Sequence, residues 1–510
     1  MPVSFDSSDS LESLPEIPPI KSASLPPMLL WSMVGAALLL FLGSSLRHLM
    51  FRSTGFDLGI YDQVTYLISQ GQTPISSILG FHHLGNHGAW AIYPLALLYK
   101  IYPSVYWLLG IQAIVLALGA WPTWRLSREA GLGQSLSIAI ALAYLLYPVI
   151  FNVNLFDFHP EVMALPALLG AILAARLRKL AWFCLAITWI LGCKAVLSLT
   201  IIALGFWLFW WEQRQIYGSL ALAMGCGWFI LVTQVIIPGF SGEEVEGIWR
   251  YTYLGNSVLE IITNLILKPQ LVLGRLFSMP TLDYFYKLSL PVIWWISPQF
   301  LVCLVPALPT LLINSLSDVS LQRSLAFQYS LPVIPFLFLG VIFSLNHQSW
   351  MLAKGMINLW RKIRIQSSDS GSKSGFPSRL PQMILLWSLL IFFCYGNMVA
   401  SGGIYKPSDT WKASEAAVAQ VEPFASVLTD NYLSPHLTHR ANLKLLSQVS
   451  PETDWLEFDY IVLNLQHPWP DTETTGISLV QQLENNPEFK VTYQNNDVMV
   501  FKQAILRSPL

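Results

Sequence analysis

The stretch FRSTGFDLGIYDQVTYLISQG, residues 51–71, directly follows one of the most apolar segments of the chain and carries two aspartates, Asp57 and Asp62. Apolar residues recur at helical spacing after Asp57, which predicts a helix that begins near this residue. Asp57 then occupies the position of an N-cap, where a carboxylate faces the free N–H groups of the first turn. The alternative interpretation is an ionised carboxylate at a membrane boundary that acts as a general base or a metal ligand. The two interpretations are compatible.

Asp62 is less constrained by its position. It lies about 140° around the helix from Asp57, so the two carboxylates need not share a site. Its side chain is predicted either to lie on a solvated helix face or to contribute to substrate binding.

The composition of the whole chain is typical of a polytopic membrane protein. Of the 510 residues, 54% are hydrophobic and 12% are charged, whereas soluble domains have about 25% charged residues. A formal net charge of −1 gives no indication of nucleic-acid binding. The cysteines lie in apolar stretches without metal-ligand spacing, and we interpret them as small buried hydrophobic residues. They are Cys184, Cys193, Cys226, Cys303 and Cys394.

About eleven apolar segments are predicted to cross the roughly 30 Å of hydrocarbon in a bilayer. They lie at 28–46, 105–124, 133–151, 162–177, 180–194, 195–211, 216–238, 287–300, 301–317, 330–346 and 382–400. Several are short, which indicates tilted or broken helices packed inside the protein. Residues 28–400 are therefore predicted to form an α-helical transmembrane domain. The polar residues 1–27 are predicted to form a disordered tail.

The distribution of lysine and arginine predicts the orientation of the chain in a cell (inner or plasma) membrane. Four basic loops fall on one side, which we interpret as cytoplasmic together with the N-terminal tail, and the most basic is residues 347–381. The loops 49–104, 151–161 and 239–286 and the residues beyond about 401 then fall on the outer side. Arg47 and Arg52 are exceptions, because they also fall on the outer side.

Residues 401–510 have the pattern of a small soluble α/β domain. Short β-type runs occur at 425–430, 443–447, 460–464, 490–494 and 498–503, and Asn495, Asn496 and Asp497 predict a hairpin turn between the last two. A polar helical stretch, residues 478–489, lies between the runs. The predicted fold class is thus a helical polytopic membrane protein with an outer α/β domain.

A histidine cluster falls in the first outer loop, in GFHHLGNHGAW, residues 80–90. His83 and His87 are four residues apart, which places two imidazoles on one face of a helix, as in some zinc sites. Gly85 and Gly88 argue against a firm helix, so polar lining of an outer cavity, including His87, is the preferred interpretation. No ligand motif indicates a metal, and the need for a divalent cation stays open.

Two further clusters of ionisable residues fall on the same side. Asp157, His159 and Glu161 lie between two predicted spans, and Lys194 lies between two apolar runs. Charges at a membrane boundary are functional candidates, although a capped interfacial turn and a snorkelling lysine are the structural alternatives. All the clusters fall on one side of the membrane, which favours a shared site there.

Several segments resemble the membrane-protein family known as domain of unknown function 2079. They are GFDLGIYDQ, NHGAWAIYPLALLYKIYPS, QAIVLALGAWPTWRLSRE, YLLYPVIFNVNLFDFHPE, FQYSLPVIPFL and ASVLTDNYLSPHLTHRANLKLLS…DYIVLN. That family is similar to C-type (GT-C) glycosyltransferases, which move a sugar from a polyprenyl-phosphate carrier to an acceptor on the outer face. The resemblance implies a GT-C-like fold over 28–400.

The resemblance also implies roles for particular residues. GT-C enzymes carry a catalytic aspartate in the first outer loop, and Asp57 is its match. They often place a cation against the donor phosphate, a role that Lys194 or Arg250 can fill. The related sequences usually read Lys-Glu-Asp near Lys194, whereas this chain reads Lys194-Ala195-Val196. Because the two acids after Lys194 are absent, other acidic residues would have to take their role. These are Asp157, Glu161, Glu243 and Glu244.

The leading functional hypothesis is an inverting glycosyl transfer on the outer face, with a polyprenyl-phosphate-linked sugar and membrane lipid as partners. Asp57 would be the base, and the substrate-binding residues would be Asp62, His87, Asp157, His159, Glu161, Lys194 and Arg250. The alternatives are a transporter or flippase of a lipid-linked or polar solute, which predicts charges at the membrane midplane, and a scaffold that binds a partner through its outer domain.

Overall fold

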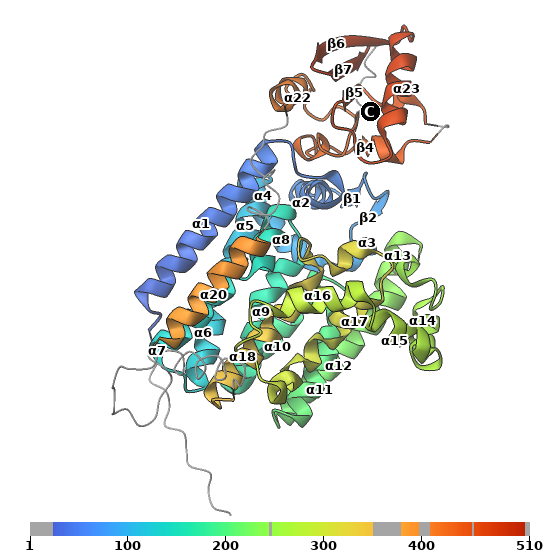
Figure 1. The fold of residues 1–510 in the computed structure, drawn as a ribbon. Helices are drawn as coiled ribbons and strands as arrows, with labels where there is room; N and C mark the ends of the chain where they lie inside the picture. Colours follow the sequence, from blue (N-terminus) through green and yellow to red (C-terminus); the bar gives the residue numbers. More distant parts are fainter. Residues whose placement is uncertain (1–23, 244–246, 350–378, 397–408, 451–452, 505–510) are drawn as a thin grey trace, which may run out of the picture.

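The computed structural model describes residues 24–243, 247–349, 379–396, 409–450 and 453–504. Residues 1–23 of the predicted tail, most of the predicted basic loop 347–381 and the first residues of the predicted C-terminal domain lie outside the described residues. The described chain forms a helical body with a small sheet domain at one end (Figure 1). The sheet domain, coloured orange to red, lies near the end of the first helix.

Among the described residues, six helical segments are long and apolar enough to cross a membrane. They are α1 (Pro27–Leu49), α5–α6 (Tyr106–Glu129), α7–α8 (Gln134–Phe156), α12 to α13 (Gln215–Ser241), the 3-10 helix η5 with α17 (Pro298–Leu316), and the 3-10 helix η7 with α18 (Gln328–Asn346). All six coincide with predicted spans. The predicted helical membrane class is confirmed, and the number of spans stays a prediction.

Shorter helices complete the body. Four match predicted spans: α9 (Glu161–Arg176), α10 (Leu180–Cys193), α11 (Leu197–Trp210) and α20 (Leu380–Tyr395). Others lie in or near the loops 49–104 and 239–286: α2 (Ile60–Ser69), α3 (Leu84–His87), α4 (Ala96–Ile101), α14 (Val258–Leu267), α15 (Pro269–Leu276) and α16 (Met279–Ser289). The span predicted over 287–300 is wrong, because α16 ends at Ser289 and turns lead to η5 at Pro298. Pro291 and Pro298 cannot supply the backbone N–H groups of a continuous helix.

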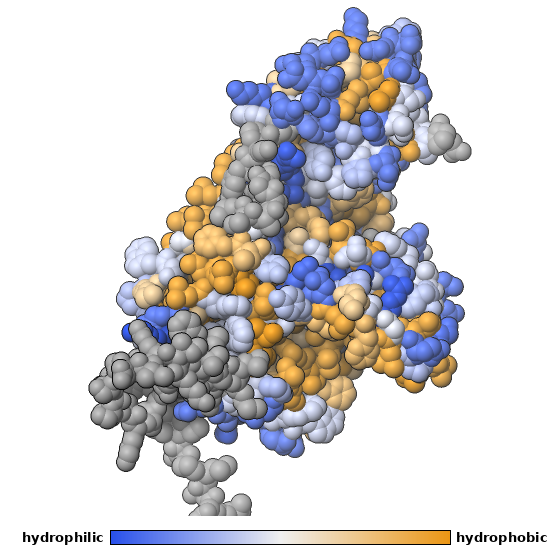
Figure 2. Space-filling view, viewed as in Figure 1, coloured by the Kyte–Doolittle hydropathy of each residue, from blue (hydrophilic) through white to orange (hydrophobic). Residues whose placement is uncertain are grey.

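In the view of Figure 2, hydrophobic residues cover large areas of the helical body, whereas hydrophilic residues cover much of the C-terminal domain. The first helix illustrates this, because Trp31, Leu39 and Leu42 are 70%, 70% and 55% exposed. Lipid is the solvent in which such side chains are stable. The surface therefore agrees with the membrane class that the composition predicts.

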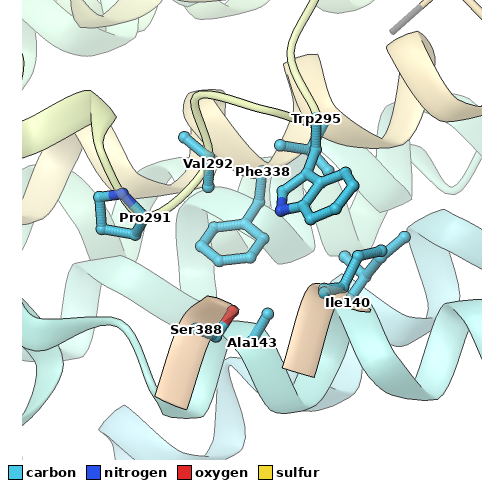
Figure 3. Close-up of a pocket in the computed structure, with 9 residues that line it drawn as sticks. Ile140, Ala143, Pro291, Val292, Trp295, Phe338 and Ser388 are labelled. Carbon is cyan, nitrogen blue, oxygen red and sulfur yellow. The ribbon is translucent and has the colours of Figure 1, made fainter. Parts of the chain in front are cut away.

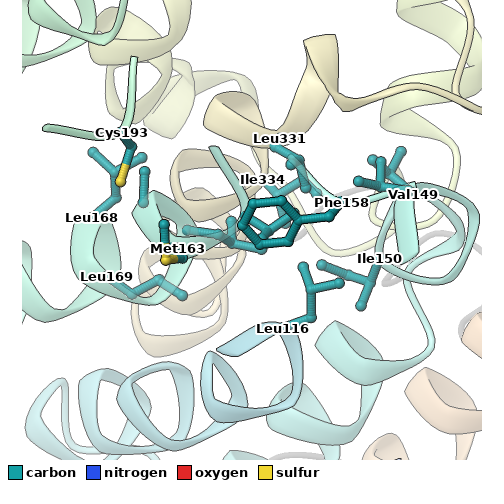
Figure 4. Close-up of a cluster of buried hydrophobic side chains, with 14 of the residues drawn as sticks. Leu116, Val149, Ile150, Phe158, Met163, Leu168, Leu169, Cys193, Leu331 and Ile334 are labelled. Atoms are coloured by element: carbon teal, nitrogen blue, oxygen red, sulfur yellow. The ribbon is translucent and has the colours of Figure 1, made fainter. Parts of the chain in front are cut away.

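Phe158, in the connection between α8 (Pro148–Phe156) and α9, belongs to the core of the helical body. This residue follows α8, is fully buried, and lies among Val149, Ile150, Met163 and Leu331 (Figure 4). Burying a phenylalanine side chain contributes about 1.5–3 kcal/mol. Phe158 thus anchors the connection between α8 and α9, on which two of the predicted site residues, Asp157 and His159, lie.

A small apolar cavity lies inside the body between α7, α18, α20 and the turns after α16. Ile140, Phe338 and Trp295 are among its lining residues, and Ser388 supplies the polar atom (Figure 3). It has room for about one water molecule. The cavity is therefore a packing defect and is too small for a lipid or a sugar.

The C-terminal domain is built on a mixed five-stranded sheet with strand order β4-β3-β5-β7-β6. Strand β3 is parallel to β4 and β5, and β7 is antiparallel to β5 and β6. The predicted hairpin is confirmed: Asn496 and Asp497 both have positive φ, as a tight hairpin turn requires. The elements are β3 (Val427–Thr429), β4 (Leu443–Leu445), β5 (Tyr460–Asn464), β6 (Phe489–Asn495), β7 (Val498–Gln503), α22 (Trp411–Val418) and α23 (Glu473–Glu484).

The C-terminal domain packs on the loop 49–104 of the helical body. Gln63 of α2 donates to the backbone oxygen of Arg440, and Ser77 donates to that of Leu443. Ser77 lies between the short strands β1 (Ile75–Ser76) and β2 (Phe81–His82), which pair with each other. In Figure 1, α2, β1 and β2 lie between the sheet domain and the helical body.

Candidate functional site

Asp57 lies in a π-helical turn, η1 (Gly55–Gly59), that leads directly into α2. The N-cap interpretation is wrong in detail, because Thr54 occupies the N-cap position and Asp57 lies inside the turn. The Asp57 side chain is 28% exposed. Single π-turns are frequent at functional sites. The turn presents a partly solvated carboxylate rather than a capping one.

His159 is the main partner of Asp57. Its Nε2 lies 3.0 Å from Oδ1 of Asp57, and its ring stacks on Phe156 with centroids 5.4 Å apart. The His159 side chain is only 2% exposed. It comes from the α8–α9 connection that Phe158 anchors. A buried imidazole thus holds a carboxylate that still reaches solvent.

The electrostatics of this pair favour its charged form. Burial lowers the pKa of His159, but the charge and hydrogen bond of Asp57 raise it, and the net pKa lies above the usual value. Burial likewise raises the pKa of Asp57, but His159 and then Lys194 lower it, and the net pKa lies below the usual value. Opposite charges stabilise each other in this way. Each partner therefore favours the charged form of the other, an imidazolium facing a carboxylate.

Asp157 lies next to this pair, and both oxygens of its carboxylate have partners within the protein. Its Oδ1 is 2.6 Å from Nη1 of Arg47, and its Oδ2 accepts from the backbone N–H of Thr54 at 3.0 Å and from the Thr54 hydroxyl at 2.8 Å. Burial raises the pKa of Asp157, Arg47 lowers it and Asp57 raises it, with a net increase. Asp157 therefore joins the C-terminal end of α1 to the site and gives Arg47 a buried counter-charge there.

Lys194 forms an ion pair with Glu161, the first residue of α9. Lys194 itself follows α10 in an extended conformation. The two side chains are 15% and 6% exposed. Glu161 therefore supplies the acidic partner that Ala195 and Val196 cannot. Glu243 is exposed and makes no ion pair among the described residues, and Glu244 lies outside them.

His87 and Arg250 lie on the cationic side of the site. Burial and then the charges of Lys194 and Arg250 keep the pKa of His87 well below its usual value, so the imidazole is neutral. Arg250, in the 3-10 helix η4 (Ile248–Tyr251), lies over the rings of Trp249 and Tyr329 at 5.2 and 5.9 Å. Its Nε has no hydrogen-bond partner in the described chain. At least one N–H donor of this guanidinium is thus not used by the described residues.

The remaining histidines of the first loop do not form a metal centre in the structure. His83 is fully buried, and its Nε2 lies 3.1 Å from the backbone oxygen of Ala89. Among the residues that the structure describes, no group of three or more histidine, cysteine, aspartate or glutamate side chains is placed to hold a metal ion.

Asp62 has a different set of partners from Asp57. It is 1% exposed, so the solvated-face alternative is wrong. The hydroxyls of Tyr99, at 2.5 Å, and of Thr438 donate to its carboxylate, and Nε2 of His439 lies 3.2 Å from Oδ2. Thr438 and His439 belong to the C-terminal domain. Asp62 therefore joins the two domains.

Two residues of the site are not predicted by the sequence patterns. Thr54 links Asp157 to the Asp57 turn, and Asn431 of the C-terminal domain contacts the same turn. Neither residue belongs to a charged cluster or to a periodic pattern. Their polar types occur in most turns and loops, so no local signal distinguishes them.

A comparison with protein-family models gives one match. The family described as predicted membrane protein (DUF2079) matches residues 47–500. The chain belongs to this family. The match includes both the helical body and the C-terminal domain, which agrees with the segments that carry the resemblance in sequence. No curated protein matches this DUF2079 chain in sequence.

Solved structures show the same fold. The crystal structure of ArnT from Cupriavidus metallidurans bound to undecaprenyl phosphate is 12% identical, covers 95% of this chain and 100% of ArnT, and has a TM-score of 0.56. ArnT from the same organism in the apo state is 13% identical, covers 92% and 97%, and has a TM-score of 0.54. ArnT is a GT-C glycosyltransferase. The DUF2079 chain therefore has a GT-C-like fold.

Proposed function

We propose that this protein is a membrane glycosyltransferase that moves a sugar from a polyprenyl-phosphate carrier to an acceptor. One observation carries the proposal: Asp57 is an ionised, partly exposed carboxylate held by buried His159 at the position where GT-C enzymes place their base. The undecaprenyl phosphate bound by ArnT, which has the same fold, supports a polyprenyl carrier. The membrane class of the chain supports a lipid-linked donor.

The proposed reaction is a single displacement with inversion. Asp57 takes the proton of an acceptor hydroxyl as its oxygen attacks the anomeric carbon of the sugar. The bond from that carbon to the phosphate oxygen breaks, and the electron pair leaves with the polyprenyl phosphate. The proton then passes from Asp57 to solvent, which reaches the carboxylate through its exposed 28%. General-base catalysis of this kind contributes about 10²–10⁴-fold in rate.

The positive side of the site suits the departing phosphate. Arg250 is the strongest candidate for phosphate contact, because guanidinium groups bind phosphate through several donors and Arg250, which packs on Trp249 and Tyr329, forms no ion pair among the described residues. Lys194 is already paired with Glu161 and contributes a weaker field. Neutral His87, beside both cations, is suited to a sugar hydroxyl.

His159 and Asp157 are assigned supporting roles in this mechanism. His159 is 2% exposed and hydrogen-bonded to Asp57, so it orients the base instead of contacting sugar. The Asp157 carboxylate is occupied by Arg47 and Thr54 and holds the turn. Membrane orientation enters the same proposal: the site and the C-terminal domain lie on the outer side, and the N-terminus is cytoplasmic.

A panel of undecaprenyl-phosphate-linked sugars tests the proposed activity. Protein in lipid nanodiscs is incubated with each donor, and release of undecaprenyl phosphate and glycosylation of extracted cell-envelope acceptors are measured. At least one donor is expected to be consumed by the wild type. The proposal fails if no donor in the panel is consumed and deletion of the gene changes no lipid-linked or envelope glycan.

Binding of undecaprenyl phosphate tests the phosphate site separately. Arg250→Gln is expected to weaken binding by about tenfold or more, because a charge-assisted contact is lost. Arg275→Gln is the matched control, since Arg275 lies in the same outer loop but pairs with Asp318 at the surface. Equal affinities for Arg250→Gln and wild type would exclude Arg250 as a phosphate ligand.

A further inference from the structure

The C-terminal domain contacts the Asp57 turn directly through Asn431. Oδ1 of Asn431 accepts from the backbone N–H of Gly55 at 2.9 Å and from that of Phe56 at 3.3 Å. The backbone oxygen of Asn431 also lies 2.9 Å from the Gly55 nitrogen. These N–H groups open the helical segment that contains Asp57, and the first N–H groups of a helix lack intrahelical acceptors. Asn431 therefore caps this segment from another domain.

The loop that carries Asn431 is held in place by hydrogen bonds within the C-terminal domain. Asp430 accepts from the backbone N–H groups of Tyr432 and Leu433, both at 2.9 Å, and from that of Asn464 on the neighbouring strand at 2.9 Å. Burial raises the pKa of Asp430 to about 6. Asn431 is 1% exposed. Its amide therefore reaches the turn from a pre-organised loop at the end of β3.

The two surfaces fit closely at Gly55. A Cβ atom at this position would lie 2.3 Å from Oγ of Ser434 and 3.0 Å from Oδ1 of Asn431. Only glycine lets the loop approach the turn this closely. The contact is thus built into both domains and not confined to one flexible side chain.

We propose that Asn431 is a positioning residue for Asp57, so that the C-terminal domain completes the active site instead of serving as a separate binding module. The inference rests on the proposed role of Asp57 as the base. Capping fixes the turn and keeps the Asp57 carboxylate at its hydrogen bond to His159. A misplacement of about 1 Å can cost about 10²-fold in rate, so a residue that never touches substrate can control turnover.

Two substitutions separate the acceptor atom from the rest of the side chain. Asn431→Ala removes Oδ1, whereas Asn431→Asp keeps an acceptor for both N–H groups. The aspartate variant loses no hydrogen bond, because Nδ2 of Asn431 has no partner in the described chain. Asn464→Ala is the matched control: Asn464 is also a buried asparagine of this domain, but its side chain donates to Thr410 and Ser414 and accepts from the backbone N–H groups of Gln466 and His467, all within the same domain.

Hydrogen–deuterium exchange of the full-length protein in nanodiscs provides a readout that needs no substrate. In Asn431→Ala, exchange at Phe56 is expected to rise about fivefold, the effect of losing a helix cap, because its N–H loses the Oδ1 acceptor whereas that of Gly55 keeps the backbone oxygen of residue 431. Asn431→Asp and Asn464→Ala are expected to keep wild-type exchange there. Unchanged exchange in Asn431→Ala, or an equal rise in Asn464→Ala, would overturn the inference even if the protein is a glycosyltransferase.

Turnover of a consumed donor provides the second readout. Asn431→Ala is expected to lower kcat by about tenfold or more and to change KM for the donor by less than about twofold. Asn431→Asp is expected to restore kcat to within about threefold and to move the acid limb of the pH–rate profile to higher pH, because a second carboxylate raises the pKa of Asp57. An Asn431→Asp variant as slow as Asn431→Ala would overturn the inference. Changed exchange without turnover of any donor would instead count against the proposed function alone.

Discussion

Nε2 of His159 lies 3.0 Å from Oδ1 of Asp57, although the two residues are 102 positions apart in the chain. The imidazole is buried and the carboxylate is partly exposed. His159 thus lies on the buried side of the pair, and the Asp57 carboxylate lies on the side that solvent reaches.

Asp57→Asn is expected to lower transfer by about 10²–10⁴-fold while thermal stability changes little. Asparagine keeps an oxygen near His159 but cannot take a proton. Turnover of the consumed donor measures the effect. Asp283→Asn is the matched control, because Asp283 is an exposed outer-loop aspartate paired with Lys287. Full activity in Asp57→Asn would remove Asp57 from the chemistry.

His159 is expected to titrate above 6.5, its ordinary value, and Asp57→Asn is expected to lower this pKa because the facing charge is lost. NMR of ¹⁵N-histidine-labelled protein measures both values. The raised pKa of His159 stabilises the fold at acidic pH, and this stability is lost as pH rises through the folded pKa. The lowered pKa of Asp57 stabilises the fold above 3.8 and this is lost as pH falls. The loop is thus most stable at pH values between the pKa of Asp57 and the pKa of His159. A His159 pKa at its ordinary value would contradict the ion pair.

Arg47→Met is expected to destabilise the protein by about 3–5 kcal/mol, because it leaves the buried carboxylate of Asp157 without a counter-charge. Adding Asp157→Asn is expected to recover much of that loss, since the unpaired charge is removed. Chemical unfolding in detergent measures both variants. If the single and double variants unfold at the same denaturant concentration, the Arg47–Asp157 pair is not coupled.

Asp62→Leu is expected to loosen the C-terminal domain. The substitution leaves the buried hydroxyls of Tyr99 and Thr438 without their acceptor, and each unsatisfied group costs about 1–3 kcal/mol. Hydrogen exchange over residues 436–443 is expected to rise. Asp409→Asn, at an exposed aspartate that also pairs with a histidine, is the control and is expected to leave exchange unchanged. Unchanged exchange in Asp62→Leu would show that other contacts hold the domains together.

Cysteine labelling tests the proposed orientation. In a background without native cysteines, Ser450→Cys is expected to react with an impermeant reagent in intact spheroplasts. Gln213→Cys, in the exposed turn between α11 and α12, is expected to react only after lysis. The reverse pattern would place the C-terminal domain in the cytoplasm and move the candidate site to the inner face.

The local features of this protein could be predicted from the sequence because they depend on neighbouring residues. Apolar runs predict helices such as 28–46 and 330–346, since length and hydropathy decide whether a segment can cross a bilayer. Asn496 and Asp497 predict a hairpin for the same reason: their backbone preferences are local. The exception, the segment 287–300, is apolar enough for a span but contains Pro291 and Pro298, which interrupt helical hydrogen bonding.

The pairing of charges was decided by the tertiary structure. The sequence places Asp57, Asp62, Asp157 and Lys194 on one side of a membrane, but it does not show that Asp57 faces His159 whereas Asp62 faces Thr438 and His439 of the C-terminal domain. These partners are more than one hundred residues apart, and their distances depend on how whole helices and domains pack. Hydrogen bonds form only within about 3 Å, and the Coulomb energy of two charges falls as the distance between them grows. The sequence alone therefore determines which groups are available, and packing determines which of them meet.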